Sequence, residues 1–140
     1  MRDAVDVRTI AAGRECDALV AECVMQWTPK GPHPLFGTPV YHHRVGRHGE
    51  GDSLLPPFSA RMEDAARVLV AMERRGYDSS CGLTHDGAYC TFRSDRAQFL
   101  ATVDPREVDG EDLTRALALA ICRAALLAVA AEAPDAGAEP

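Results

Sequence analysis

The segment from 113 to 131, LTRALALAICRAALLAVAA, most constrains how this chain can fold, because a helix of this sequence is apolar nearly all round. Its charged residues are Arg115 and Arg123. A membrane span would place Arg123 near the middle of the bilayer, where a charge is costly, and the many alanines make the segment only mildly hydrophobic. We therefore expect no membrane contact and a soluble, buried helix that is covered on more than one side. A sheet would cover one side. The first helix or a second copy of the chain would cover another, and we expect a homo-oligomer through this C-terminal helix.

Length and charge narrow the class of protein. At 140 residues the chain is long enough for one domain with a substantial core. A formal net charge of -6 argues against a non-specific nucleic-acid binder, which needs clustered cations. The five cysteines form an odd set without a secretion signal, which favours reduced thiols. We expect a cytoplasmic protein of a bacterial host cell, with nucleic acid an improbable partner.

Residues 12–27, AGRECDALVAECVMQW, have the apolar spacing of one helix face. Cys16 and Cys23 lie seven residues apart, so the pattern places both on the buried face. Two helical turns separate them by roughly 10 Å of rise, which is too far for a disulfide. We interpret them as small apolar core groups rather than a metal or redox pair.

Residues 28–58 have a different composition. Six of the chain's nine prolines lie here, with several glycines and most of the histidines, so we predict a long loop. Loops of this length within small domains are usually functional or disordered. Short strand segments near residues 40–45 are an alternative for part of it.

Regular structure resumes at residue 59. Ser59 is the expected N-cap of a second helix, which Gly76 ends. Asp86-Gly87 predicts a hairpin turn, with Leu83 opposite Cys90.

The same turn sets Cys81 opposite Phe92, so that Leu83, Cys90, Cys81 and Phe92 would line the core. A third strand follows at 97–103, and the last helix runs to about residue 131. Residues 133–140 are expected to be a disordered tail.

The predicted fold class is therefore α+β, an α/β sandwich with the order α-(long loop)-α-β-β-β-α and a three-stranded antiparallel sheet. It forms a single domain over residues 1–132, with the first helix at 12–27, the loop at 28–58 and the αβββα block at 59–131. Double-stranded RNA-binding domains share the element order of that block. Here Glu111 and Asp112 open the last helix, where RNA binding would want lysines, so the topology is shared and the chemistry is not.

Three motifs resemble those of the phage ABA sandwich domain family of small phage and prophage proteins. The first helix follows the family pattern Gly-Arg-Glu-Leu-Asp-Ala-Leu-Val-Ala-Glu-x-Val-Met-Gly-Trp, with departures at Cys16 and Gln26. LPPFSARMEDAARVL and ALAICRAALLAV resemble the blocks that open the second helix and form the closing helix. The family block often has an acidic residue where this chain has Arg61, and a tryptophan where it has Ala66. The resemblance covers most of residues 8–131 and implies a helix-sheet sandwich of phage type. It carries over no catalytic residue.

Metal binding and catalysis are the less favoured chemistries. His33, His42, His43 and His48 could supply imidazoles, but no tight ligand pattern is present, and adjacent histidines in a strand point to opposite faces. All five cysteines fall on faces that the pattern predicts to be buried, and no catalytic motif appears. We expect no metal, no cofactor and no enzymatic activity.

The candidate ligand-binding residues lie in the segment YHHRVGRH. They pair an aromatic ring with cations, which suits phosphates and bases. The predicted function is capture of a phosphate-bearing small molecule, such as a host immune nucleotide signal, by analogy with phage proteins that sequester such signals. One alternative is an adaptor or inhibitor of a host defence protein that uses an apolar patch from the closing helix or from Leu54-Leu55. Another is a nucleic-acid-binding accessory protein. The six candidates are Tyr41, His42, His43, Arg44, Arg47 and His48.

Overall fold

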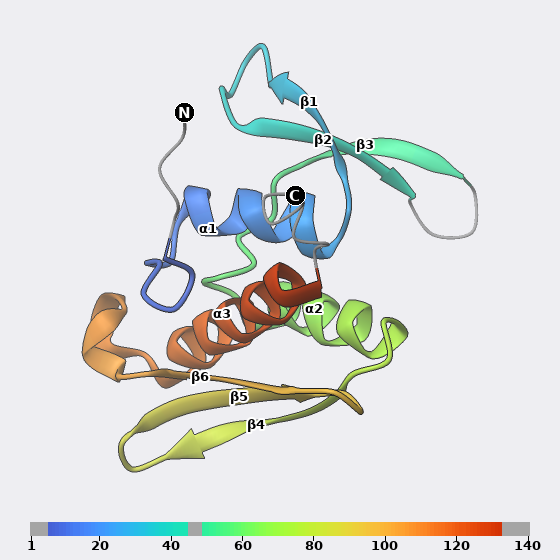
Figure 1. The fold of residues 1–140 in the computed structure, drawn as a ribbon. Helices are drawn as coiled ribbons and strands as arrows, with labels where there is room; N and C mark the ends of the chain where they lie inside the picture. Colours follow the sequence, from blue (N-terminus) through green and yellow to red (C-terminus); the bar gives the residue numbers. More distant parts are fainter. Residues whose placement is uncertain (1–5, 45–48, 133–140) are drawn as a thin grey trace.

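Helices lie between two three-stranded antiparallel sheets in the computed structural model of the chain (Figure 1). The structure describes residues 6–44 and 49–132. This arrangement confirms the predicted α+β sandwich class. The predicted tail at 133–140 lies outside the described residues.

The elements follow one another along the chain in two blocks. The first holds α1 (Arg14–Leu19), the π-helix η1 (Val20–Val24), and the sheet of β1 (Thr28–Pro32), β2 (Pro39–Arg44) and β3 (Glu50–Leu54). The second holds α2 (Met62–Arg74), the sheet of β4 (Asp78–Thr84), β5 (Gly87–Arg93) and β6 (Gln98–Val103), two 3-10 turns η2 (Pro105–Glu107) and η3 (Asp109–Glu111), and α3 (Leu113–Glu132).

The prediction of a long loop at 28–58 is wrong, because most of this segment forms the β1-β2-β3 sheet. The alternative of strand segments near 40–45 is confirmed by β2. Tyr41 pairs with Ser53, and Thr28 pairs with His42. All five residues of β1 are exposed and its ladder is interrupted between Pro29 and Gly31, so β1 shows no alternation of buried and exposed side chains. Periodicity detects a strand only where one of its faces is buried, which is why the sequence pattern missed this sheet.

Cys23 is exposed rather than buried, which corrects the pairing of Cys16 and Cys23 on one face. The helix widens into a π-turn at Val20, where the N–H of Met25 donates to the carbonyl of Val20 at 2.9 Å. The widened turn rotates the following residues, so Val24 occupies the buried position that an α-helix would give to Cys23.

Ser59 does not cap α2, whose N-cap is Arg61 without a side-chain bond. Ser59 is instead fully buried, and its N–H and hydroxyl both donate to Asp17 Oδ1, at 2.8 and 2.7 Å. The N–H of Gly13 donates to the Ser59 hydroxyl oxygen at 3.0 Å. Burial raises the pKa of Asp17 above its ordinary value, against the lowering effect of the Ser59 hydrogen bonds. Asp17 therefore fixes the start of α1 to the segment before α2, and does not form a local ion pair.

The β4-β5 hairpin turns one residue earlier than predicted. Thr84 pairs with Gly87, which sets Cys81 opposite Cys90. The Thr84 hydroxyl accepts from Asp86 N at 3.1 Å and donates to Gly87 O at 3.2 Å, which stabilises the turn at His85-Asp86. The shift of two residues in pairing keeps every side chain on its predicted face.

Burial on that face falls off toward the turn. Cys90 and Phe92 are fully buried and Cys81 partly buried, but Leu83 is 48% exposed and does not line the core. Gly87 lies so near β6 that a Cβ there would sit 2.3 Å from Val103 O. The third strand, predicted at 97–103, is confirmed with Ala101 and Val103 buried.

Helix α3 is the centre of the core. It packs against β5 and β6 on one side and against α2 and η1 on others, so this chain itself covers most of its surface. The helix is long and apolar enough to cross a membrane, but 61% of its most apolar window is buried inside the domain. That burial is typical of the core helix of a soluble protein.

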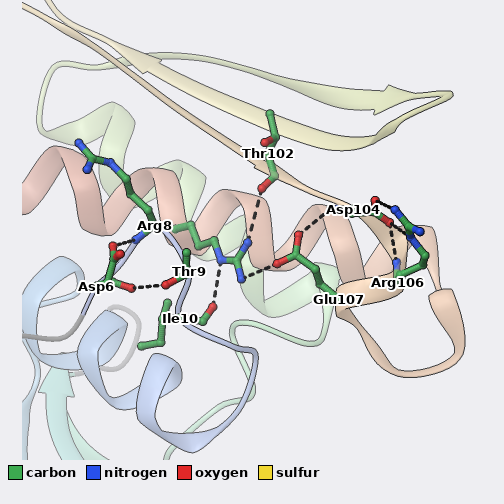
Figure 2. A network of polar contacts seen from close by, with 9 residues as sticks. Asp6, Arg8, Thr9, Ile10, Thr102, Asp104, Arg106 and Glu107 are labelled. Atoms are coloured by element: carbon green, nitrogen blue, oxygen red, sulfur yellow. Dashed lines mark hydrogen bonds and ion pairs between the residues drawn. The ribbon is translucent and has the colours of Figure 1, made fainter.

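Arg123 is the charge inside this apolar helix, and it is 3% exposed. Its guanidinium donates to Ile10 O at 2.9 Å, to Thr102 O at 3.5 Å and to Glu107 Oε1 at 3.0 Å (Figure 2). Glu107 Oε2 in turn accepts from the N–H of Asp104. One side chain of α3 thus holds the N-terminal segment, the end of β6 and η2 together.

Replacing Arg123 should destabilise the protein. Arg123→Met keeps much of the volume but leaves the Ile10 carbonyl without its donor, at a cost of about 2–3 kcal/mol in the free energy of unfolding. Arg115→Met, on the exposed start of the same helix, should change it by no more than about 0.5 kcal/mol. Urea unfolding at neutral pH measures both. Equal stabilities for the two variants would contradict the structural role of Arg123.

Candidate functional site

The three predicted ligand residues with described side chains, Tyr41, His42 and His43, do not come together at one surface. Tyr41 and His43 project from the face of β2 that looks toward the helices, and His42 projects from the opposite face, as expected for neighbours in a strand. Arg44 ends β2, and only its backbone is described. Arg47 and His48 lie outside the described residues.

Tyr41 is buried, with 2% exposure. Its hydroxyl donates to Glu22 Oε2 at 2.7 Å. Burial of the phenol, and to a smaller extent the hydrogen bond to Glu22, raises the pKa of Tyr41 above its ordinary value. The hydrogen bond attaches the β1-β2-β3 sheet to the first helix. Tyr41 therefore has a structural role in the described fold, and its predicted role in ligand binding stays a prediction.

His42 is held between two carboxylates on the outer face of the sheet. Its Nδ1 lies 2.7 Å from Asp52 Oδ1, and its Nε2 lies 2.7 Å from Glu50 Oε1. Both nitrogens can donate only when the ring is protonated. The hydrogen bond to Asp52, then that to Glu50, raises the pKa of His42, and the His42 bond lowers the pKa of Asp52. His42 is therefore paired with its own strand neighbours, and its predicted role in ligand binding stays a prediction.

His43 stacks on Trp27, with ring centroids 3.8 Å apart and planes 11° from parallel. Its Nε2 lies 2.7 Å from Ser53 Oγ. The pair forms one wall of a cleft of about 730 Å³ between the end of the first helix, β2 and the outer face of α2. We name it the arginine cleft. Its lining residues are Val24, Met25, Gln26, Trp27, His43, Arg67, Val70, Ala71, Arg74 and Arg75.

Helix α2 contributes the opposite wall. Arg67, Val70, Ala71 and Arg74 follow the spacing i, i+3, i+4 and i+7, so they share one helix face. Sequence reasoning missed this face because it followed only the buried apolar stripe of the helix. The signal was available as two arginines seven residues apart, with apolar residues between them.

The three arginines of the cleft differ in how many contacts they make with the rest of the protein. Arg75 donates to Cys23 O at 3.0 Å, to Val24 O at 3.2 Å and to Glu132 Oε1 at 2.6 Å, so it holds helix ends together. Arg67 lies over Trp27, 5.1 Å from the ring centroid, and 3.9 Å from Asp64. Arg74 is exposed and makes no hydrogen bond or ion pair with any residue that the structure describes.

The cleft is therefore a cationic site on an acidic protein. No carboxylate is among the residues that line it, although the chain has a formal net charge of -6. Across residues 6–44 and 49–132, no group of three or more His, Cys, Asp or Glu side chains is arranged to hold a metal ion. The arrangement suits an anion that also offers a flat or apolar part.

Comparisons with known proteins support the fold. No family model matches the sequence, and no curated protein is significantly similar to it. A crystal structure of a phage protein from Bacillus cereus ATCC 14579 is similar to this chain, with a TM-score of 0.52 and 16% sequence identity. The match covers 90% of this chain and 94% of that one. This likeness shows the fold alone, and membership of the phage ABA sandwich family stays a prediction.

The pKa of His42 should lie above that of an isolated histidine. Its stabilising contribution is fully present below the unfolded pKa of about 6.5 and is lost as pH rises through the higher folded value. The stabilising contribution of Asp52 depends on pH in the opposite direction. It is lost as pH falls through the lowered folded pKa of Asp52. The pair is therefore strongest between these two folded pKa values.

NMR titration of the histidine ring protons measures this directly. Asp52→Asn should lower the pKa of His42, whereas Asp86→Asn, at an exposed carboxylate in a distant turn, should leave it unchanged. An unchanged pKa of His42 in Asp52→Asn would contradict the hydrogen bond between His42 and Asp52.

Proposed function

We propose that this protein captures a phosphate-bearing small molecule in the arginine cleft and does not transform it. The observation that carries the proposal is a cleft wall with three arginines and no carboxylate, on a protein with a formal net charge of -6. Guanidinium groups bind phosphate oxygens through paired, charge-assisted hydrogen bonds. The acidic remainder of the protein disfavours a long polyanion, so the cleft favours a compact anion.

Arg74 and Arg67 are the phosphate-binding candidates, since Arg75 is already held by two backbone carbonyls and Glu132. The cleft volume of about 730 Å³ lies within the range typical of small-molecule sites. Val70, Ala71 and Met25 supply apolar surface for a sugar or a base. A nucleotide combines the two parts that such a site accepts.

The biological ligand that we favour is a host immune nucleotide signal, bound in the cytoplasm of a bacterium. The phage protein of similar fold supports a phage-type setting for this chain. Assembly through the C-terminal helix stays part of the proposal. Leu113 at 43% exposure, together with the partly buried Leu117 and Leu127, is the surface of α3 that a second copy would cover.

A protein adaptor is the second candidate, supported by one observation. The turn between β1 and β2 exposes Leu35 by 83% and Phe36 by 66%. Of the patches first predicted for this role, Leu54 is 42% exposed, whereas Leu55 is 9% exposed and the middle of α3 is buried. A nucleic-acid-binding accessory role is the third alternative, and the short cationic face of α2 is its only support in the described surface.

Isothermal titration calorimetry with pyrophosphate and AMP tests the capture function. We expect Arg67→Gln and Arg74→Gln each to weaken binding by about tenfold, because each removes one charge-assisted contact. Arg115→Gln removes the same charge outside the cleft and should leave the affinity unchanged. Raising the salt concentration should weaken binding of the parent protein.

Two results would overturn the proposal. One is the absence of binding to either probe by the parent protein at millimolar concentration. The other is equal affinity in the parent and in the Arg67→Gln/Arg74→Gln double variant. If that double variant retains binding and Leu35→Ser/Phe36→Ser loses it, the turn between β1 and β2 would be favoured as the binding surface instead.

A further inference from the structure

Gln26 has a backbone conformation that glycine normally supplies. Its φ is 60°, in the left-handed region, immediately after the π-turn that ends the first helix. The N–H of Trp27 donates to Ala21 O at 2.8 Å and closes that end. Helices commonly finish in this way, and the left-handed residue is usually glycine because a Cβ is strained there.

No interaction of the Gln26 side chain with described residues offsets the cost of this strained backbone. The bonds that end the helix are made by backbone groups of other residues, so a glycine would preserve them. The side chain of Gln26 is exposed, and its amide makes no hydrogen bond with any described residue. A residue that costs stability without a structural return is characteristic of functional sites.

The side chain lines the arginine cleft, on the wall that also contains Trp27. Among the residues of this cleft, Gln26 has the one side chain that offers a hydrogen-bond donor and an acceptor next to each other. A nucleobase edge presents a donor beside an acceptor in the same way, and glutamine pairs with such edges through two hydrogen bonds. Apolar surfaces cannot provide this match.

We infer that Gln26 is a specificity-determining residue whose amide binds the base edge of a nucleotide, while Arg67 and Arg74 bind its phosphate. This inference rests on the proposed function and names its ligand class as a nucleotide selected by its base. Gln26 lines the cleft at the point where the first helix ends.

Two variants separate the amide from the strain. Gln26→Gly removes both, and should raise Tm by about 3 °C because the left-handed backbone is no longer strained. Gln26→Met keeps the strained backbone and the length of the side chain but removes the amide, so its Tm should match that of the parent. A purely structural Gln26 would affect Tm alone.

Calorimetry with AMP, GMP, CMP, UMP and base-free pyrophosphate gives the second measurement. We expect the parent protein to separate its best and worst nucleotides by about tenfold, as two hydrogen bonds allow. Both variants should reduce that spread to less than about threefold and leave the pyrophosphate affinity unchanged.

The outcomes distinguish the two proposals. An unchanged spread in both variants, or a parent protein that binds pyrophosphate and all four nucleotides equally, would overturn the role of Gln26 and leave phosphate capture intact. A parent protein that binds none of the five probes would overturn the proposed function, and the inference with it.

Discussion

Helix α3 has no polar face, and the rest of the fold follows from the need to cover it. The β4-β5-β6 sheet covers one side, and α2 and η1 cover others (Figure 1). Arg123 lies inside this apolar contact and is tolerated because Ile10, Thr102 and Glu107 accept its hydrogen bonds. Each guanidinium nitrogen has an acceptor, and this favours one arrangement of the partners, since losing them would leave the buried charge unpaired. The helix that is apolar enough to span a membrane is thus the element around which the core of this domain packs.

The arginine cleft forms where this core meets the β1-β2-β3 sheet. That sheet contacts the helical body through Tyr41 with Glu22 and through His43 with Trp27. The outer face of α2, which α3 leaves uncovered, supplies the arginines of the facing wall. If the cleft binds the proposed ligand, a helix on one side and a stacked aromatic pair on the other would set the shape of the site before binding. Such preorganisation lowers the entropic cost of binding.

Sequence patterns predicted the parts of the fold that alternate between water and core. They located α2, the hairpin, β6 and α3, because each buries one face or is buried throughout. They gave a strand near β2 only as an alternative and missed the rest of the β1-β2-β3 sheet, since all five residues of β1 are exposed. They misplaced Cys23 because a π-turn has no clear sequence signature. The cleft could not be predicted as a unit, since it joins residues 24–27, 43 and 67–75, which only the tertiary fold brings together. Of the six predicted ligand residues, His43 alone among those with described side chains lines the cleft.

Gln26 was visible in the sequence as a departure from the glycine of the resembling family pattern. Only its left-handed backbone conformation gives that departure a physical meaning.

Native mass spectrometry of the protein purified from bacterial cytoplasm, before and after denaturation, tests the central claim most directly. The account predicts a bound mass of nucleotide size in the parent protein that denaturation releases and the Arg67→Gln/Arg74→Gln variant lacks. The same spectrum reports the number of chains in the assembly. A protein that carries no such mass, and that acquires none when a mixture of nucleotides is added, would contradict the assignment of the arginine cleft as a ligand site.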